Sequence, residues 1–418
     1  MEFRDGMTPW EDFFGINAKF APLAIFFHLT QLTIMKQSDI LVLGGGVGGV
    51  AAAGILSGKL TGKARITLID KKEKFQFPPS YPWLMVGKRE PGEIQRNLID
   101  LEKRGINVIK DDIIAIDPQA KSIRTKSTQL SGDYIIISLG AQYNPGLIEG
   151  FEEYAKHIYD LESAIIFSNA VGKFKQGTIT IGISKLPFKC PAAPYEVALL
   201  LDDYFARKGI RNRIRMEFFT PELNPVPSVG PEIGTKVLNL LKTRDIGYHP
   251  GLKLSKVSEN KIFFENGEQM EFDILFSTPP HQAPEPVVSA GLTDSTGWIP
   301  VDTKTLETKF PGVYAIGDVT SIPTPNGYVP YLPKAGVFAH GQAETVAANI
   351  INEILGRAGR KEWDGRGACF LETGNGRSAF MKGEFISSPR PRIDFHDPGK
   401  VWHMQKVVLE KYWLRHWF

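Results

Sequence analysis

The sequence predicts an α/β protein built from two Rossmann-like domains, and three short stretches carry this prediction. The first, DILVLGGG at 39–46, is an apolar run that is typical of a buried parallel strand and ends in a glycine-rich turn. The second is GTITIGI at 177–183, and the third is FPGVYAIGDVT at 310–320. A helical stretch follows each of them, and strands that alternate with helices indicate parallel sheets covered by helices.

Composition places the chain among ordinary globular proteins. Its 418 residues are 42% hydrophobic and 23% charged, and this length favours two or three lobes over a single core. A net charge of +3 is too small to indicate a nucleic-acid partner. No run approaches the roughly 20 apolar residues of a membrane span. Two cysteines exclude a disulfide scaffold, and the absence of a CxxC motif or His/Cys cluster argues against a metal site.

The first glycine-rich turn is the strongest local signal. Gly44, Gly46 and Gly49 have the GxGxxG spacing, in which the glycines permit a tight turn, close approach of a pyrophosphate, and close helix–strand packing. The next predicted strand, ARITLID at 64–70, ends in Asp70, where an acid that binds a ribose is expected. These four residues therefore predict a dinucleotide site. The alternative is a glycine-rich turn that binds no ligand.

Two further stretches indicate which dinucleotide is bound. The strand at 310–320 resembles the second FAD motif of flavoproteins with two dinucleotide-binding domains, in which the aspartate holds the ribityl chain. YIIISLGA at 134–141 resembles the crossover between the two domains of these proteins. The order of the three motifs favours FAD over NAD at the first site. The resemblance implies that Asp318 binds FAD and that Gly317 leaves room for it.

The second domain lacks the glycine-rich turn that would bind a nicotinamide dinucleotide. The strand at 177–183 is followed by SKLPFKCPAAPYE, in which Cys190 stands where the phosphate-binding turn is expected. Pro187, Pro191 and Pro194 stiffen this turn and remove backbone donors that a pyrophosphate would need. The sequence therefore predicts that the protein does not oxidise NADH.

Four segments carry a resemblance to a known family. FKCPAAPYE at 188–196 resembles the cysteine motif of the sulfide:quinone oxidoreductases and of the related flavoprotein subunit of flavocytochrome c sulfide dehydrogenase. The segments at 74–89, 327–350 and 367–380 are similar to further motifs of these proteins, and the resemblance covers about 36–418. It implies a glutathione-reductase-like flavoprotein that binds FAD, oxidises hydrogen sulfide and reduces a membrane quinone.

The resemblance also implies a domain plan. Met35 opens a run that begins as nucleotide-binding folds commonly do, so the preceding residues are interpreted as an extension or as the product of a misassigned start codon. The remaining boundaries follow the order of the motifs. The expected parts are an extension at 1–34, the first part of the FAD-binding domain at 35–150, a second Rossmann-like domain without a nucleotide turn at 151–295, the second part of the FAD-binding domain at 296–360, and a cysteine segment with a membrane and quinone region at 361–418.

Both cysteines have a joint interpretation within this family. The resemblance implies that Cys190 and Cys369 meet beside the flavin. Sulfide attacks a disulfide, which leaves one cysteine as a persulfide and the other as a thiolate. A thiolate of low pKa beside the flavin then passes both electrons to it. Two unrelated buried thiols are the alternative. Many members of the family carry a third cysteine where this chain has Tyr159.

The resemblance assigns roles to four further residues. Glu196 is expected to move a proton during sulfide attack, with a pKa raised by an apolar pocket, although a glutamate in a first helical turn is also favoured by the helix dipole. Lys334 is expected near the flavin ring, where it would stabilise the anionic reduced flavin; a solvent-facing lysine is the alternative. Phe370 or Phe380 is expected to sandwich a quinone ring.

The C-terminal stretch at 399–418 contains three tryptophans, with Lys406, Lys411 and Arg415 between them. Tryptophan and basic residues are typical of a membrane–water interface. At helical spacing, however, the charges do not gather on one side. Two interpretations therefore remain, a monotopic anchor that opens a quinone channel and a tail helix packed on the flavin domain. The expected location is peripheral, at the cytoplasmic membrane, and a homo-oligomer remains open.

The sequence leaves three alternative functions open. A sulfide dehydrogenase would donate its electrons to a cytochrome c partner instead of a quinone. A type II NADH:quinone oxidoreductase would use the same fold but would need a nucleotide turn in the second domain. A flavoprotein with a degenerate site would bind sulfur without catalysis. The cysteine motif around Cys190 and the aromatic and basic C-terminal stretch favour the sulfide:quinone oxidoreductase.

Overall fold

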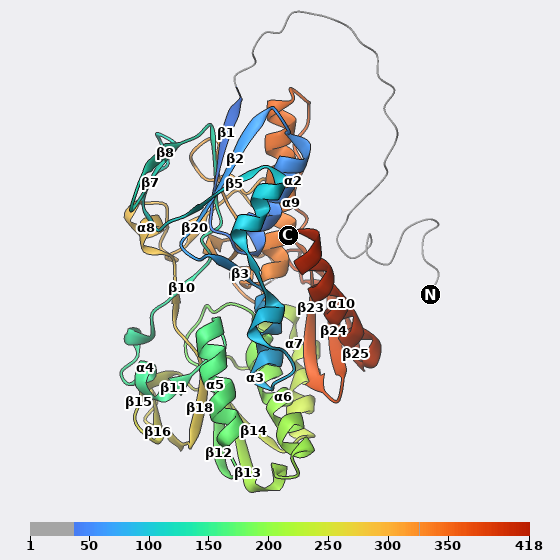
Figure 1. Cartoon of the computed structure of the whole chain (residues 1–418). Helices are drawn as coiled ribbons and strands as arrows, with labels where there is room; N and C mark the ends of the chain where they lie inside the picture. Colours follow the sequence, from blue (N-terminus) through green and yellow to red (C-terminus); the bar gives the residue numbers. More distant parts are fainter. Residues whose placement is uncertain (1–36, 326) are drawn as a thin grey trace, which may run out of the picture.

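The structure is a computed structural model that describes residues 37–325 and 327–418. The extension expected at 1–34 lies outside the described residues, so its interpretation stays a prediction. Two groups of strands and helices stand one above the other in Figure 1, and the C-terminal strands and helix lie along one side of both. Within the two described ranges, no helix is long and apolar enough to span a lipid bilayer.

The first sheet is the one that the glycine-rich motif predicts. Its five parallel strands run in the order β21 (Val313–Ala315), β9 (Tyr134–Ile137), β1 (Ser38–Leu43), β2 (Ala64–Asp70) and β5 (Ile106–Lys110). Strand β1 lies at the centre, and its buried residues Ile40, Val42 and Leu43 belong to a strand that is covered on both faces. Strand β21 joins this sheet after the chain has passed through the second sheet.

Helices cover one face of the first sheet and a small antiparallel sheet covers the other. Helix α2 (Val47–Lys59) packs against helix α9 (Gly336–Ile354) on the first face. On the second face, apolar side chains pack against Leu41 and Leu43 of β1. They come from β6 (Ile113–Asp117), β7 (Ser122–Thr125), β8 (Gln129–Ser131) and α8 (Glu285–Ser289).

The second sheet also has five parallel strands. They run in the order β11 (Ala155–Lys156), β18 (Ile274–Thr278), β12 (Gly177–Ile183), β13 (Ile214–Thr220) and β14 (Ile246–Pro250). The strand expected at 177–183 is β12. The helix expected near Pro194 begins at Ala193, so the prediction of two Rossmann-like domains is confirmed.

Helices and a second small antiparallel sheet accompany these strands. Phe219 of β13 lies in a buried apolar cluster with residues of this small sheet, so the second sheet is also covered. The helices are α4 (Phe151–Tyr154), α5 (Leu161–Lys173), α6 (Ala193–Arg207) and α7 (Pro231–Lys242). The small sheet consists of β15 (Leu254–Val257), β16 (Lys261–Phe264) and β17 (Gln269–Glu271).

The C-terminal segment joins the two domains. Its three antiparallel strands are β23 (Arg366–Gly374), β24 (Arg377–Glu384) and β25 (Arg392–Gly399), and helix α10 (Lys400–His416) follows them. Strand β23 packs against α6 of the second domain and against α9 of the first. These elements, red in Figure 1, therefore bring residues from the end of the chain to the boundary between the domains.

Helix α10 buries two charged side chains and exposes several large apolar ones. Its buried residues are Lys406, Glu410, Trp413 and Leu414. Its large exposed apolar residues are Val401, Met404, Val408 and Tyr412, which recur every three or four residues and so share one side of the helix. The ring of Trp413 stacks on Phe75 with centroids 4.4 Å apart. The expectation that Lys406 and the tryptophans face a membrane is therefore wrong for Lys406, Trp413 and the buried Trp417.

Shorter elements complete the fold. The remaining helix is α3 (Tyr81–Met85), and the remaining strands are β3 (Lys74–Gln76), β4 (Gln95–Asn97), β10 (Gln142–Tyr143), β19 (His281–Gln282), β20 (Ile299–Pro300) and β22 (Thr320–Ser321). Single 3₁₀ turns are η1 (Pro78–Ser80), η2 (Pro91–Ile94), η3 (Leu98–Arg104), η4 (Pro145–Leu147), η5 (Arg211–Arg213), η6 (Pro227–Val229) and η7 (Gly317–Val319).

Candidate functional site

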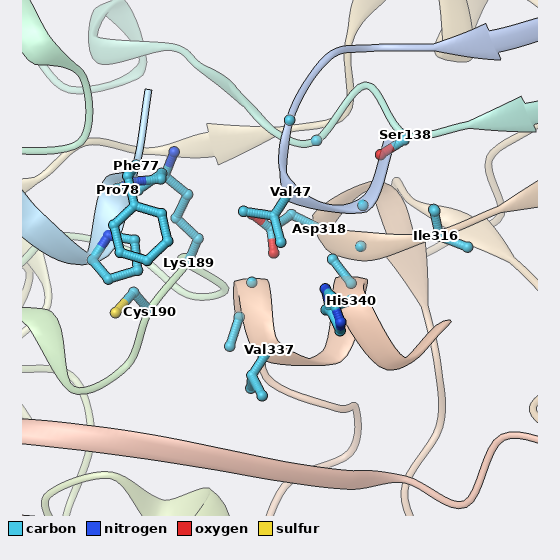
Figure 2. Close-up of a pocket in the computed structure, with 18 of the residues that line it drawn as sticks. Val47, Phe77, Pro78, Ser138, Lys189, Cys190, Ile316, Asp318, Val337 and His340 are labelled. Atoms are coloured by element: carbon cyan, nitrogen blue, oxygen red, sulfur yellow. The ribbon is translucent and has the colours of Figure 1, made fainter. Parts of the chain in front are cut away.

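A cavity of about 2180 Å³ extends from the glycine-rich turn of the first domain to the C-terminal segment. Pockets for a single small molecule usually have about 300–1,000 Å³, so this one has room for a dinucleotide and a further ligand. In the view of Figure 2, Lys189 and Cys190 lie on one side and Ser138 and His340 on the other, with Asp318 between them. Most of the predicted site residues line this cavity.

Each of the three glycines in the turn is favoured at its position for a different structural reason. Gly44 has a φ of +102°, and a Cβ added to it would lie 2.4 Å from the carbonyl oxygen of Ser138. A Cβ at Gly49 would lie 1.9 Å from the carbonyl oxygen of Gly44, so this glycine is required for close helix–strand packing. A Cβ at Gly46 would meet no atom within 4 Å. Since Gly44 and Gly46 line the cavity, the open space beside Gly46 fits a bulky ligand.

Asp70 lies at the end of β2 and lines the cavity, where the ribose-binding acid is expected. Its Oδ2 accepts a hydrogen bond from the backbone N–H of Gly45 at 2.6 Å, and its Oδ1 accepts one from that of Lys72 at 2.7 Å. The carboxylate therefore fixes the glycine-rich turn as well as facing the cavity. Its contact with a ribose stays a prediction.

Asp318 lines the cavity and has a buried hydrogen-bond acceptor without a partner in the described part of the chain. The preceding Gly317 has a φ of +77°, and its N–H donates to Oε1 of Gln342 at 2.7 Å. The Oδ1 atom of Asp318 is buried and finds no hydrogen-bond partner in the described part of the chain. Burial raises the pKa of this carboxyl, and Lys189 and Lys334 offset part of the rise. A buried acceptor without a partner fits a ligand with hydroxyl groups, so the residues present fit a flavin dinucleotide.

Cys190 lies in the turn between β12 and α6. Its φ of +56° is uncommon for a residue with a side chain, and such conformations cluster at functional sites. Its N–H donates to the carbonyl oxygen of Lys334 at 2.6 Å, and its own carbonyl oxygen accepts from Ala193 at 2.9 Å. The turn is thus tied to the segment before α9, which holds the thiol at the wall of the cavity.

Cys369 lies on β23, opposite Met381 of β24, and lines the same cavity as Cys190. Both cysteines are free thiols. Burial raises the pKa of both thiols, that of Cys369 to about 12, and Cys369 is the largest charge that acts on Cys190. Burial is the main cause of both raised pKa values, and the charge of Glu196 adds to each of them. The low pKa of the thiolate released beside a bound flavin stays a prediction.

Lys406 is the cation that faces both thiols, and its charge lowers the pKa of each against the effect of burial. Its Nζ donates to Oε1 of Glu196 at 2.8 Å. The same carboxylate oxygen accepts from the backbone N–H of Glu372 at 2.8 Å. Burial raises the pKa of Glu196 in the predicted direction, while Lys406 offsets part of the rise. Burial alone would lower the pKa of Lys406, but Glu196 and Glu372 raise it, so Lys406 stays charged.

Two further polar residues extend this buried group. The carboxylate of Glu372 is buried and lies 3.0 Å from Nδ1 of His403 on α10. Burial would raise the pKa of Glu372, but the hydrogen bond with His403 and the charge of Lys406 hold it below its usual value. Sequence reasoning missed Lys406, Glu372 and His403, because they follow no motif and come together only through packing of β23, α6 and α10.

Lys334 is buried beside η7, the turn that contains Asp318. Its Nζ donates to the carbonyl oxygens of Asp318 at 2.7 Å and Thr320 at 3.1 Å, and lies 3.4 Å from the ring centroid of Trp298. Burial lowers the pKa of this lysine to about 7, so the alternative of a solvent-facing lysine is wrong. Lys189 and Lys406 are among the lysines that line the large cavity. Contact between Lys334 and the flavin ring stays a prediction.

The two quinone candidates lie together. Phe370 of β23 pairs with Phe380 of β24, and their ring centroids are 5.0 Å apart. Phe380 also stacks on Trp402 of α10 at 4.8 Å and on His396 of β25 at 5.8 Å. All four side chains line the cavity that Cys369 lines. The sequence could not choose between the two phenylalanines, and the structure gives them a common aromatic cluster.

Tyr195 packs into the core near the start of α6, the helix whose N-terminus would face a pyrophosphate in a nucleotide-binding second domain. The ring of Tyr195 is fully buried and stacks on Phe218 at 4.7 Å. Its hydroxyl lies 3.3 Å from Oε2 of the buried Glu222, which follows β13. A dinucleotide needs free backbone N–H groups at this helix terminus. The arrangement supports the expectation that no nicotinamide nucleotide binds here.

A sequence profile of the family described as pyridine nucleotide-disulphide oxidoreductase matches residues 38–182 and 204–343. The chain belongs to this family. A mitochondrial sulfide:quinone oxidoreductase of Mus musculus is 27% identical to this pyridine nucleotide-disulphide oxidoreductase, over 87% of this chain and 82% of the relative. A sulfide-quinone reductase of Aquifex aeolicus is 29% identical over 90% of both chains.

A solved structure agrees with these relatives. The crystal structure of the sulfide:quinone oxidoreductase from Aquifex aeolicus matches this pyridine nucleotide-disulphide oxidoreductase with a TM-score of 0.84 and 27% identity, over 91% of each chain. The resemblance to the sulfide:quinone oxidoreductase family, drawn from the cysteine motifs, is thereby confirmed. Membership also indicates that the chain is a flavin-dependent oxidoreductase.

Proposed function

We propose that this protein is an FAD-dependent sulfide:quinone oxidoreductase. The observation that carries the proposal is that Cys190 and Cys369, which come from segments far apart in the sequence, line one cavity together with the glycine-rich turn. Hydrogen sulfide gives up two electrons and two protons and becomes sulfane sulfur. A quinone takes up both electrons and two protons and becomes a quinol, so the overall reaction balances. The similarity to proteins named for this activity supports the assignment.

FAD is the dinucleotide that the first domain would hold. Gly44 and Gly46 would face its pyrophosphate, Asp70 its ribose, and the unpartnered Oδ1 of Asp318 its ribityl hydroxyls. When bound, the flavin supplies two-electron transfer between the sulfur chemistry and the quinone. The residues that hold it lie on rigid elements, since β2 ends at Asp70 and β21 leads directly into Asp318.

The sulfur chemistry belongs to the two cysteines. In their oxidised form, hydrosulfide attacks one sulfur of the disulfide, which forms a new S–S bond to that cysteine and releases the other as a thiolate. Because burial raises the pKa of both thiols, the released thiolate needs a nearby positive charge. Lys406 provides it, and Glu196 positions the lysine through their 2.8 Å ion pair. We also propose that the carboxyl group of Glu196 moves a proton during the attack by sulfide.

Asp318→Ala should weaken flavin binding. The substitution removes the only carboxylate of η7, and hydrogen bonds to a charged group contribute about 1.5–3 kcal/mol, so the Kd for FAD should rise about tenfold to a hundredfold. The ratio of flavin to protein after gel filtration measures the effect, and thermal unfolding checks that the fold persists. Asp318→Asn keeps a neutral acceptor of the same shape, so its Kd for FAD should lie between those of the wild type and of Asp318→Ala. Full occupancy of the alanine variant would count against this role.

The exposed stripe of α10 is proposed to place the enzyme on a membrane surface. Val401, Met404, Val408 and Tyr412 lie on one side of the helix, and the opposite side is packed on the protein. Apolar residues on the exposed side of a surface helix, next to a basic residue such as Lys411, suit binding within the headgroup region. The aromatic cluster of the cavity includes Trp402 of the same helix, so a lipid quinone would enter close to this surface.

Removing this stripe should detach the protein from lipid. We expect Val401→Ser combined with Met404→Ser and Val408→Ser to lower the fraction that sediments with phospholipid vesicles by about tenfold, because about 25 cal/mol per Å² of buried apolar area is lost. A soluble quinone analogue should still be reduced at the wild-type rate, since the stripe lies outside the cavity. If the triple variant sedimented with vesicles as well as the wild type does, the proposed membrane-binding surface would be wrong.

The proposed function is tested by steady-state assays with three donor and acceptor pairs. The purified flavoprotein should reduce a soluble quinone analogue with sulfide as donor. NADH with the same quinone should give only background rates, because Tyr195 and the prolines around Cys190 leave no phosphate site in the second domain. Sulfide with cytochrome c should also be slow. Fast reduction of the quinone by NADH, or of cytochrome c by sulfide, would favour the corresponding alternative function.

A further inference from the structure

An aromatic and basic cluster includes Lys189, the residue that precedes Cys190 in the chain. It consists of Tyr143, Tyr159, Lys189 and His281. The side chain of Tyr159 is 4% exposed, and its hydroxyl is buried without a hydrogen-bond partner in the described part of the chain. Buried hydroxyls are almost always hydrogen-bonded, so this one indicates a partner that is not part of the chain. Tyr159 lines the cavity beside Cys190.

Packing fixes the position of this hydroxyl. The backbone carbonyl of Tyr159 accepts a hydrogen bond from the hydroxyl of Tyr143 at 2.6 Å. The ring of Tyr159 meets the rings of Tyr143 and His281 edge-on, with centroids 6.3 Å and 5.3 Å apart. Nδ1 of His281 is in turn hydrogen-bonded to the carbonyl oxygen of Pro279 at 2.6 Å. The rings of Tyr143 and His281 therefore fix the phenol on two sides, and its hydroxyl is left without a hydrogen-bond partner in the described part of the chain.

The charges around the cluster favour an anion next to the thiol. Burial raises the pKa of Tyr159, and Cys190, which lines the same cavity, is the first of the neighbouring charges that raise it further. The ammonium group of Lys189 lies 4.8 Å from the ring of Tyr143 and 5.9 Å from that of Tyr159. Burial lowers the pKa of Lys189, and the negative charges of Asp318, Cys190 and Asp160 offset part of the fall. Burial lowers the pKa of His281 to about 3, so His281 is neutral.

We propose that Tyr159 and Lys189 form the binding subsite for the hydrosulfide anion beside Cys190. The phenol donates a hydrogen bond to the sulfur, and the ammonium group balances its negative charge. Figure 2 shows Lys189 and Cys190 on the same wall of the pocket. The subsite rests on the proposed function for its substrate. It adds a reason for selectivity, because a small anionic sulfur nucleophile satisfies both groups and a neutral thiol satisfies only one.

Tyr159→Phe removes the hydroxyl and keeps the ring. In stopped-flow measurements of sulfide-dependent flavin bleaching, the sulfide concentration at half-maximal rate should rise about tenfold to a hundredfold, while the limiting rate changes by less than about threefold. Because this hydroxyl has no partner among residues 37–325 and 327–418, the Tm of the variant should not fall. Tyr248→Phe removes another buried phenol hydroxyl outside the cavity and should leave both kinetic values unchanged.

A second measurement does not depend on turnover. In the reduced protein, anionic iodoacetate and neutral iodoacetamide both alkylate Cys190, and Lys189→Met should lower the ratio of the two rates about tenfold. A ratio that Lys189→Met leaves unchanged would overturn the anion subsite, as would wild-type sulfide saturation in Tyr159→Phe. If the wild-type flavin were not bleached by sulfide at all, the proposed function would fail, while a lowered alkylation ratio would still support an anion subsite at this place.

Discussion

Replacing either Cys190 or Cys369 by serine should abolish flavin reduction by sulfide, with a loss of at least about a thousandfold in rate. Each sulfur depends on the other, because one must accept the substrate sulfur while the other leaves as a thiolate. The double variant should therefore be no slower than either single variant. Residues that serve one step together show this kind of non-additivity. Stopped-flow flavin absorbance on the four proteins measures it.

The control for the cysteine variants is the second half of the reaction. Reduction of the flavin by dithionite and its reoxidation by a quinone analogue should survive all three substitutions, because neither step uses a thiol. Loss of quinone reoxidation would mean that the variants are damaged more widely. If Cys369→Ser still reduced its flavin with sulfide at close to the wild-type rate, the paired-sulfur mechanism would be wrong.

Lys406→Met should cost about 3–5 kcal/mol of unfolding free energy, because it leaves the buried carboxylate of Glu196 without its cation. Adding Glu196→Gln should recover part of the loss, since the carboxylate is then gone as well. Lys411→Met, on the same helix but half exposed, should cost less than about 1 kcal/mol. Urea unfolding of the four proteins measures these differences. Equal losses for Lys406→Met and Lys411→Met would contradict the role given to the buried pair.

The loss in Lys406→Met should also depend on pH. Burial already raises the pKa of Glu196 in the folded protein, and removal of Lys406 raises it further above its unfolded value. A carboxyl with a raised folded pKa favours the folded state only while it is protonated, so its contribution is lost as the pH rises through that pKa. The deficit of Lys406→Met should thus be smaller at about pH 5 than at about pH 8. A deficit that does not change with pH would show that Glu196 is not the group involved.

The parts of the fold that sequence could predict are those built from local patterns. The strand and turn at Gly44–Gly49, the acid at the end of β2, and the strand and helix around Cys190 each follow from residue types within about ten positions. The joint role of Cys190 and Cys369 could not be predicted in this way, because no local pattern connects two segments so far apart in the sequence. It came from the resemblance alone, and the structure supplies the shared cavity.

Helix α10 shows where reading from composition failed. Its tryptophans and lysines suggested a polar interface, but burial of Lys406 depends on Glu196, which lies 210 residues earlier in the chain. The exposed stripe was hidden for a related reason, since the helix buries Lys406 and Glu410 and exposes Val401, Met404, Val408 and Tyr412. The missed role of Tyr159 has a related cause. A tyrosine in a loop carries no signal until the structure shows that its hydroxyl is buried without a partner.

The most direct test of the central claim is a pair of half-reactions on the wild-type flavoprotein under anaerobic conditions. Sulfide is mixed with the oxidised protein in a stopped-flow instrument while the flavin absorbance is followed, and a quinone analogue is then added. The account predicts rapid bleaching by sulfide, formation of a persulfide on a peptide that contains Cys190 or Cys369, and recovery of the absorbance with quinone. Bleaching by NADH, with no response to sulfide, would contradict it.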